Sequence, residues 1–249
     1  MSTLFIADIH LSPDQPVMTQ LFLNFLRQQV SQQAEALYLL GDLFETWIGD
    51  DYLSPFHLSI ITALAELSAK GIKLYFMPGN RDFLIGKGFI QQTGCRYLTD
   101  PTIITLYGTS TLLTHGDSWC TLDKQYLRYR RWSRYAFSQA LFLRLPRPWR
   151  QKIAFYLRHY QEPISGSFEP KYDIVLHDLL AYLNQHPNTL QIIHGHTHQP
   201  GIQLIKQTNN TWIRRFTLSD WSSTKGNVLI AQPHAPFKLT YFNTSTSFI

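Results

Sequence analysis

The 249-residue sequence predicts an α/β fold, a layered sandwich of mixed sheets flanked by helices. Short apolar runs with strand character alternate with amphipathic stretches, and from Trp212 onward the pattern changes to strands alone. No internal repeat, low-complexity tract or linker divides the chain. With 44% hydrophobic and 16% charged residues, the chain can bury a core, and wholesale disorder is excluded. We therefore expect one domain over residues 1–249.

A polar residue, a glycine or, after Met77, a proline directly follows each expected strand of the body. These strands are Leu4–Ala7, Ala36–Leu40, Lys73–Met77, Leu112–Thr114 and Gln191–Ile193. Apolar residues recur at three- and four-residue spacing, as in amphipathic helices, across Met18–Gln33 and Leu58–Lys70. The last expected strands are Trp212–Leu218, Asn227–Ala231 and Lys238–Phe242.

Positive charge is concentrated in one segment. The chain has 22 Lys and Arg against 17 Asp and Glu, a net charge of +5. Residues 124–158 hold ten basic and no acidic residues, which leaves −5 on the rest of the chain. We expect two helices here, Leu122–Leu145 and Trp149–Tyr160, separated by Pro146 and Pro148. They form a basic, aromatic-rich helical insert at about residues 122–168.

Three interpretations of the insert stay open on composition alone. It is a solvated basic face, a nucleic-acid surface with arginines for phosphates and aromatic rings for stacking, or a pair of helices on an anionic membrane. Its apolar residues favour lipid contact. The amino terminus lacks the basic region of a signal peptide, and no apolar run approaches the roughly 20 residues of a membrane span. We therefore expect a cytoplasmic protein that does not cross the membrane.

Two cysteines, Cys95 and Cys120, are too few for a disulfide scaffold. Neither has an obvious basic partner in the sequence, so we expect each to be a small buried residue rather than a nucleophile.

Metal-binding residue types follow every expected strand of the body. In order, these are Asp8 and His10, then Asp42, then Asn80, then His115, and last the three histidines His194, His196 and His198. Loops at the carboxyl ends of strands converge on one edge of α/β folds. A lone D-x-H or G-D is more often a turn, whereas alternating histidines suit imidazole ligation. All five motifs together predict metal binding.

This ordered set resembles the calcineurin-like metallophosphoesterases from Leu4 to His198. The resemblance implies two metal ions, with the first held by Asp8, His10, Asp42 and His198. The second would be held by Asp42, Asn80, His115 and His196, with Asp42 bridging the pair. Mixed oxygen and imidazole ligands suit Mn²⁺, Fe²⁺ or Zn²⁺ better than Ca²⁺. His194 matches no ligand position, so we expect a supporting or structural role for it.

Arg81 stands where many members of this family have a histidine that protonates a poor leaving group. A guanidinium stays charged at any relevant pH and cannot donate that proton. The favoured substrate is therefore one whose leaving group needs no proton, such as a phosphate leaving from a diphosphate. Arg81 can instead pair with phosphate oxygens as charge builds up.

Longer motifs narrow the resemblance to the family of UDP-2,3-diacylglucosamine diphosphatases of lipid A biosynthesis. They are G-D-L-F-E-T-W-I-G-D-D at 41–51, G-N-R-D-F-L-I-G-K at 79–87 and H-G-D-S-W-C-T-L-D at 115–123. The resemblance implies two Mn²⁺ ions and hydrolysis of UDP-2,3-diacylglucosamine to UMP and 2,3-diacylglucosamine 1-phosphate. It also implies peripheral attachment to the anionic cytoplasmic face of the inner membrane, with no nucleic acid and no obligate protein partner.

Substrate contacts also follow from this resemblance. It implies roles for Asn80, Arg81 and His196 at the diphosphate and for Asp123 near the sugar nucleotide. The lysine that the family has near residue 168 is missing, so Ser165 and Lys171 are the candidates in the insert.

Three alternatives remain. A hydrolase of soluble nucleotide sugars or dinucleoside polyphosphates would act without lipid or detergent. A nucleic-acid-processing phosphoesterase would lose DNA or RNA affinity steeply with salt. A non-catalytic metal-binding scaffold is disfavoured because no ligand position is missing.

Overall fold

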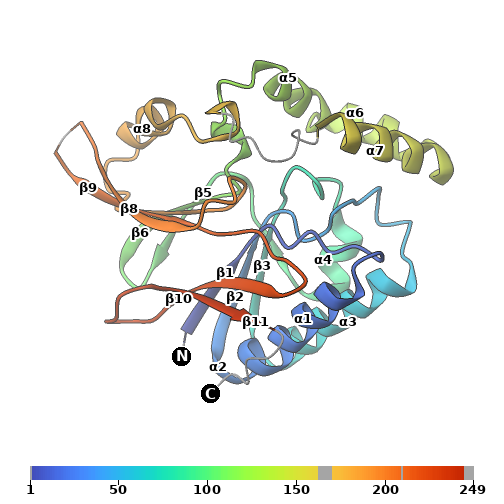
Figure 1. Cartoon of the computed structure of the whole chain (residues 1–249), viewed down its shortest axis with the longest axis horizontal. Coiled ribbons are helices and arrows are strands. Elements are labelled where there is room, and N and C mark those ends of the chain that lie inside the picture. Colours follow the sequence, from blue (N-terminus) through green and yellow to red (C-terminus); the bar gives the residue numbers. More distant parts are fainter. Residues whose placement is uncertain (1, 162–169, 209, 244–249) are drawn as a thin grey trace.

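The computed structural model describes residues 2–161, 170–208 and 210–243. Two mixed β-sheets pack face to face with helices on their outer sides, which confirms the expected α/β sandwich (Figure 1). The six-stranded sheet contains, in spatial order, β11 (Lys238–Asn243), β10 (Lys225–Ala231), β1 (Ser2–Ile6), β2 (Ala34–Leu40), β3 (Lys73–Met77) and β4 (Arg96–Tyr97). The five-stranded sheet contains β5 (Thr102–Leu106), β6 (Thr109–Thr114), β7 (Gln191–His194), β9 (Trp212–Thr217) and β8 (Gly201–Lys206).

Parallel pairing brings the chemically important strand ends together. β1, β2 and β3 are parallel neighbours, and so are β6, β7 and β9. Adjacent parallel strands end at the same edge of a sheet, so the loops after them meet there. The antiparallel partners β10, β11, β5 and β8 complete the two sheets without contributing to this edge.

The outer layer of the six-stranded sheet consists of α1 (Pro16–Phe25), α3 (Pro55–Ala69) and α4 (Lys87–Thr93). Between α1 and α3 lie a π-helical turn (Leu26–Val30), α2 (Ser31–Gln33) and strand β2. Side chains of β1 alternate, as a pleated strand requires. Leu4 and Ile6 pack with Phe22 of α1 and the other helices, whereas Phe5 faces the second sheet.

Two further apolar clusters complete the layers. Phe5 and Tyr38 meet Leu113, Ile193 and Phe216 between the two sheets. On the far side of the five-stranded sheet, helix α8 (Leu176–Asn184) packs Leu179 and Leu183 against Leu112, Ile192 and Ile213. Two short 3-10 turns lie between β6 and α8, Asp117–Trp119 before the insert helices and Pro170–Tyr172 after them.

The insert contains three helices rather than the two expected: α5 (Lys124–Ser133), α6 (Ala136–Leu143) and α7 (Arg147–Gln161). The single helix predicted for Leu122–Leu145 is therefore wrong. It breaks at Tyr135, whose backbone is extended, just after Ser133 has turned its hydroxyl back onto the carbonyl of Arg130. Hydroxyl groups that bond to the local backbone compete with helix continuation. In Figure 1 these insert helices lie along one end of the molecule, apart from the two sheets.

Both cysteines are buried, as expected, and burial raises the pKa of Cys95 to about 11 and that of Cys120 to about 12. Among the described helices, none is long and apolar enough to cross a membrane.

Candidate metal centre

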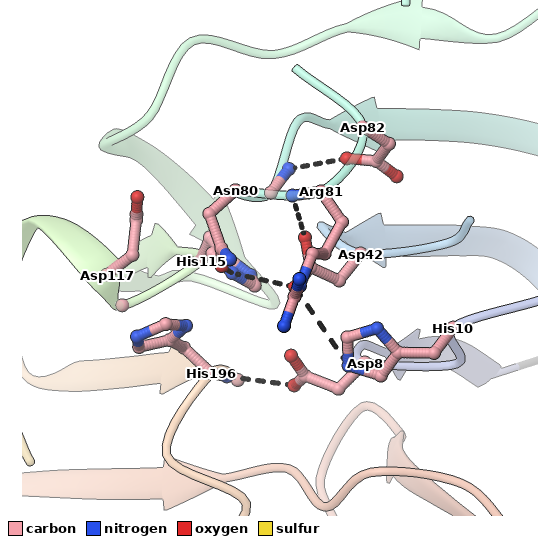
Figure 2. Close-up of polar contacts among 12 residues, drawn as sticks. Asp8, His10, Asp42, Asn80, Arg81, Asp82, His115, Asp117 and His196 are labelled. Carbon is pink, nitrogen blue, oxygen red and sulfur yellow. Dashed lines mark hydrogen bonds and ion pairs between the residues drawn. The ribbon is translucent and has the colours of Figure 1, made fainter. Parts of the chain in front are cut away.

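All seven side chains expected to hold metal come together where the parallel strands end. Asp8 and His10 follow β1, Asp42 follows β2, Asn80 follows β3, His115 follows β6, and His196 and His198 follow β7. Figure 2 labels six of them, which face a shared space between the two sheets. The structure thus collects residues that are up to 190 positions apart in the sequence.

Short distances join these side chains. Asp42 Oδ2 lies 3.6 Å from His115 Nε2 and 4.0 Å from His10 Nε2. Asn80 Oδ1 lies 3.0 Å from His115 Nε2, and His198 Nε2 lies 3.6 Å from Asp8 Oδ1. Two sets of three have ligand atoms close enough for one ion each, Asp8 with His10 and His198, and Asp8 with Asp42 and His115.

The carboxylate shared by these two sets is Asp8, whereas the family resemblance implies Asp42 as the bridge. Asp42 Oδ2 still lies within 4.0 Å of one histidine from each expected metal site. Both carboxylates are almost fully buried, with Asp8 0% and Asp42 2% exposed. The cluster therefore has two buried anions at its middle and imidazoles around them.

The donor set fits divalent cations. Asp8 Oδ2 accepts a hydrogen bond of 2.8 Å from the backbone nitrogen of His196, but Asp8 Oδ1 accepts none from the described residues. A buried carboxylate oxygen without a hydrogen bond is costly unless another positive group compensates it. Carboxylate, amide and imidazole donors together are typical ligands of Mn²⁺, Fe²⁺ and Zn²⁺.

Electrostatics around the cluster favour charged carboxylates. Burial alone would raise the pKa of Asp8, but electrostatic attraction from the nearby histidines, above all His198, outweighs it and holds the pKa well below its usual range. Burial would lower the pKa of His115, yet the carboxylates of Asp42 and Asp8 raise it to about 9. His196 has no such dominant partner, so burial lowers its pKa to about 4.

Left-handed backbone conformations aim most of these side chains inward. Asp8, His10 and Asp42 each have φ of 54°, and His198 and His196 have φ of 53° and 67°. Positive φ is uncommon for residues other than glycine, although Asp and His tolerate it better than most. Such strained residues cluster at functional sites, where the surrounding structure holds them.

Two motif glycines leave room for the carboxylates. A Cβ on Gly79 would come 2.1 Å from Asp42 Oδ1, and one on Gly195 would come 2.2 Å from Asp8 Oδ2. The glycine before Asn80 and the glycine between His194 and His196 are therefore required by close packing against the metal ligands.

Asp82 holds two of the loops in place, a role that the sequence did not reveal. It is fully buried, and its carboxylate accepts hydrogen bonds of 2.8 Å from the backbone nitrogens of Gly79 and Leu43. The loops that carry Asp42 and Asn80 are thereby tied together (Figure 2). Burial, together with repulsion from Asp42, raises the pKa of Asp82 to about 6.

Arg81 lies beside the cluster rather than among the ligand atoms. Its backbone nitrogen donates to Asp42 Oδ1 at 2.8 Å, and its guanidinium lies 3.9 Å from Glu45 Oε1. Glu45 Oε2 in turn lies 3.0 Å from His10 Nδ1, which connects Arg81 to the ligand set through one carboxylate.

His194, the first histidine of the H-G-H-T-H loop, has both ring nitrogens engaged elsewhere. Its Nε2 accepts a hydrogen bond of 2.8 Å from Arg215 Nε, and its Nδ1 lies 2.8 Å from the carbonyl of Gly195. Burial and the nearby Arg215 lower the pKa of His194 to about 3, so the ring is neutral. No nitrogen is left to coordinate a metal.

Asp117, the acid of the H-G-D motif, anchors the insert. It is fully buried, accepts a hydrogen bond from the hydroxyl of Tyr126, and lies 2.8 Å from Arg130 Nε. Arg130 also pairs with Asp100 at 2.9 Å, and Arg134 donates to the carbonyl of Gly79 at 2.7 Å. Arg130 and Arg134 therefore direct their guanidinium groups toward the body, so not all ten basic residues of residues 124–158 are available to an outside partner.

A mainly apolar cavity of about 380 Å³ lies between the insert helices and the cluster. Asn80 and Arg81 line it at the cluster end. The body contributes Trp47 and Phe83, and the insert contributes Phe142 and Leu157. Apolar pockets with a few polar groups at one end are typical ligand sites.

Of the three further residues expected to contact the substrate, the structure describes Asp123 and Lys171. Asp123 caps α5 by accepting a hydrogen bond of 2.8 Å from the backbone nitrogen of Tyr126. Lys171 has its ammonium 4.8 Å from the centre of the Tyr172 ring. Ser165 lies outside the described residues. Substrate contacts from all three stay a prediction.

Comparison with known proteins agrees with this geometry. Residues 1–200 match the calcineurin-like phosphoesterase family. A protein of Aeromonas hydrophila named UDP-2,3-diacylglucosamine hydrolase is 44% identical over 94% of this chain and 95% of its own length. Proteins of the same name from Photobacterium profundum and Pseudomonas paraeruginosa are 42% and 43% identical, covering 94% and 89% of this chain and 94% and 91% of their own. The chain therefore belongs to the calcineurin-like phosphoesterase family.

Proposed function

We propose that this protein hydrolyses the diphosphate bond of UDP-2,3-diacylglucosamine, giving UMP and 2,3-diacylglucosamine 1-phosphate in lipid A biosynthesis. One observation carries the proposal: the carboxylate and imidazole cluster, the Arg81 guanidinium and an apolar cavity of about 380 Å³ adjoin one another. The cluster and Arg81 suit a diphosphate, and the cavity suits an acyl chain. The names of the most similar relatives support this substrate.

Two divalent ions, Mn²⁺ in our proposal, occupy the cluster. Asp8, His10, Asp42 and His198 would hold one ion, and Asp42, Asn80, His115 and His196 the other. When bound, a metal pair supplies Lewis acidity for activating water and stabilising phosphoryl oxygens. The buried Asp8 Oδ1, which accepts no hydrogen bond from the described residues, supports this assignment because a bound cation would compensate it.

Arg81 would bind the diphosphate and offset the negative charge that develops on it. Its backbone is fixed to Asp42 at 2.8 Å, so its guanidinium starts from a defined point next to the cluster. Preorganised donors of this kind stabilise a developing charge without reorganising during the reaction. Because the leaving group is a phosphate, no proton donor is needed at this position.

The insert at about residues 122–168 would serve as a lid on a single domain. Its inner side lines the apolar cavity with Phe142, Ile153 and Leu157, which suits an acyl chain leaving the glucosamine. A hydrolase of soluble nucleotide sugars has no use for an apolar chamber beside Arg81. The cavity thus favours the lipid substrate over this alternative.

The outer side of the insert would lie on the anionic cytoplasmic face of the inner membrane. Large rings project from it, with Tyr135 63%, Phe137 68% and Trp149 65% exposed. Basic residues that are exposed on the same helices include Arg128 and Arg131. Exposed aromatic rings among cations suit the interface of an anionic bilayer.

Incubation of the purified protein with UDP-2,3-diacylglucosamine and Mn²⁺ in detergent, followed by mass spectrometry, tests the proposal. We expect UMP and 2,3-diacylglucosamine 1-phosphate, and no reaction after chelation. The matched comparison uses UDP-glucosamine and a dinucleoside polyphosphate without detergent. Faster hydrolysis of these soluble compounds would contradict the lipid-linked substrate.

A further inference from the structure

Arg150 of helix α7 is a buried cation far from the metal ligands. Its side chain is 2% exposed and is the largest of the fully buried side chains in the described structure. Arg150 NH1 donates to the carbonyl of Ile48 at 2.6 Å and to Asp51 Oδ1 at 2.7 Å, and NH2 pairs with Asp51 Oδ2. A buried guanidinium must keep such partners, because an unpaired buried charge is strongly destabilising.

The loop that contains Ile48 and Asp51 packs closely against Arg150. Gly49 has a φ of +126°, a conformation that side-chain-bearing residues rarely adopt. A Cβ at this position would come 2.6 Å from Arg150 NH1 and 2.7 Å from Leu143 Cδ2 of α6. Glycine at residue 49 therefore lets both α6 and α7 approach the body.

The same loop is fixed to the body from its other side by Asp50. The Asp50 carboxylate accepts hydrogen bonds from Trp47 Nε1 at 3.1 Å and from the backbone nitrogens of Gly86 and Gly88 at 3.0 and 2.8 Å. These glycines lie at the start of α4. Arg150 thus connects α7 to a loop that cannot move freely.

The contacts of Arg150 lie at the wall of the apolar cavity. Trp47 and Ile48 line the cavity from the loop, and Ile153 and Leu157 line it from α7, within two turns of Arg150. On its other side α7 borders a second cavity of about 700 Å³, lined by Tyr52 of the body among others. Cavities therefore flank this helix on two sides, and Arg150 is a buried polar contact between it and the body.

We propose that Arg150 is a positioning residue that holds α7 closed over the apolar cavity and so determines the affinity for long acyl chains. The inference rests on the proposed function, since it assigns the cavity to acyl chains. Arg150 touches neither the metal ligands nor Arg81 in the contacts described, so it acts on binding and not on the chemical step.

The test compares Arg150→Met with Arg147→Met. Arg147 lies on the same helix and also pairs with Asp51, at 3.4 Å, but it is 57% exposed, which makes it a matched control. Each variant is assayed with UDP-2,3-diacylglucosamine bearing long chains and with an analogue whose chains are acetyl groups. For Arg150→Met we expect KM for the long-chain substrate to rise about tenfold or more, with kcat within about twofold and the acetyl analogue unaffected. Arg147→Met should behave as wild type.

Equal losses on both substrates, or no change in KM, would overturn the proposal. Should Arg150→Met fail to fold, Asp51→Asn keeps the hydrogen bond to Ile48 and should show the same split between KM and kcat. Amide hydrogen exchange separates this inference from the proposed function, because it needs no substrate. Residues 151–157 should exchange faster in Arg150→Met than in Arg147→Met, and equal exchange would refute the positioning role even if wild type hydrolyses another compound.

Discussion

Replacing Gly79 with alanine would displace a metal ligand by an amount that the structure defines. A Cβ at residue 79 would come 2.1 Å from Asp42 Oδ1 and 2.3 Å from the Asp42 backbone nitrogen, where real Cβ contacts stay above 3.0 Å. Asp42 or its loop must therefore move by about 1 Å, and a misplacement of that size can cost about 10²-fold in rate. The carboxylate that shifts is the one proposed to bridge the two metal sites.

The assay measures bound Mn²⁺ per chain and kcat/KM on UDP-2,3-diacylglucosamine for Gly79→Ala. The control is Gly201→Ala at the start of β8, where a Cβ would meet no atom within 4 Å. We expect Gly79→Ala to lose metal and about 10²-fold in kcat/KM, with Gly201→Ala unchanged. A folded Gly79→Ala protein that keeps two ions and wild-type turnover would refute the reasoning about close packing.

Three other predictions address charge. Arg81→Ala should lose about 10²–10³ in turnover, as for one preorganised donor, and a gain of diphosphatase activity in Arg81→His would contradict the leaving-group argument. Burial lowers the pKa of His57 to about 4. In the unfolded chain His titrates near 6.5, so between pH 6.5 and 4 the unfolded state binds more protons than the folded state. The free energy of unfolding should therefore fall by at most about 3 kcal/mol over this range. Urea unfolding of His57→Gln should show a free energy of unfolding that lacks this contribution to the pH dependence. Reversing Arg128, Arg131 and Arg144 to Glu should weaken binding to anionic vesicles in sedimentation assays without loss of metal, and unchanged binding would exclude this surface as the membrane contact.

The fold and the cluster could be predicted because both depend on local patterns. The apolar runs Leu4–Ala7 and Ala36–Leu40 are followed closely by Asp8 and Asp42. The two strands pair in parallel, so both acids lie at the same edge of the sheet. The same sequence patterns do not predict the backbone φ and ψ angles of the ligand residues. Nothing in the sequence shows that Asp8 and His198 need positive φ to face each other.

The insert was predicted less well because its charges depend on distant partners. Ten basic residues without an acid among them indicate a surface-charged segment. In the structure, Arg130 pairs with Asp117 and Arg150 pairs with Asp51, which is 99 residues away. The acids that pair with these arginines lie outside the insert. Counting the basic residues of the insert alone therefore overestimates how many of its charges are unpaired. Similarly, the break at Tyr135 goes with a local hydrogen bond from Ser133 to the carbonyl of Arg130 and with a tertiary one from Arg134 to the carbonyl of Gly79.

The central claim is that the cluster around Asp8 and Asp42 holds a pair of metal ions. Electron paramagnetic resonance of the protein loaded with Mn²⁺, combined with metal analysis, tests it most directly. The proposed ligand sets predict two ions per chain and the spectrum of a magnetically coupled pair, which Asp42→Ala abolishes. A single ion per chain, or two ions with uncoupled spectra that Asp42→Ala leaves unchanged, would contradict it.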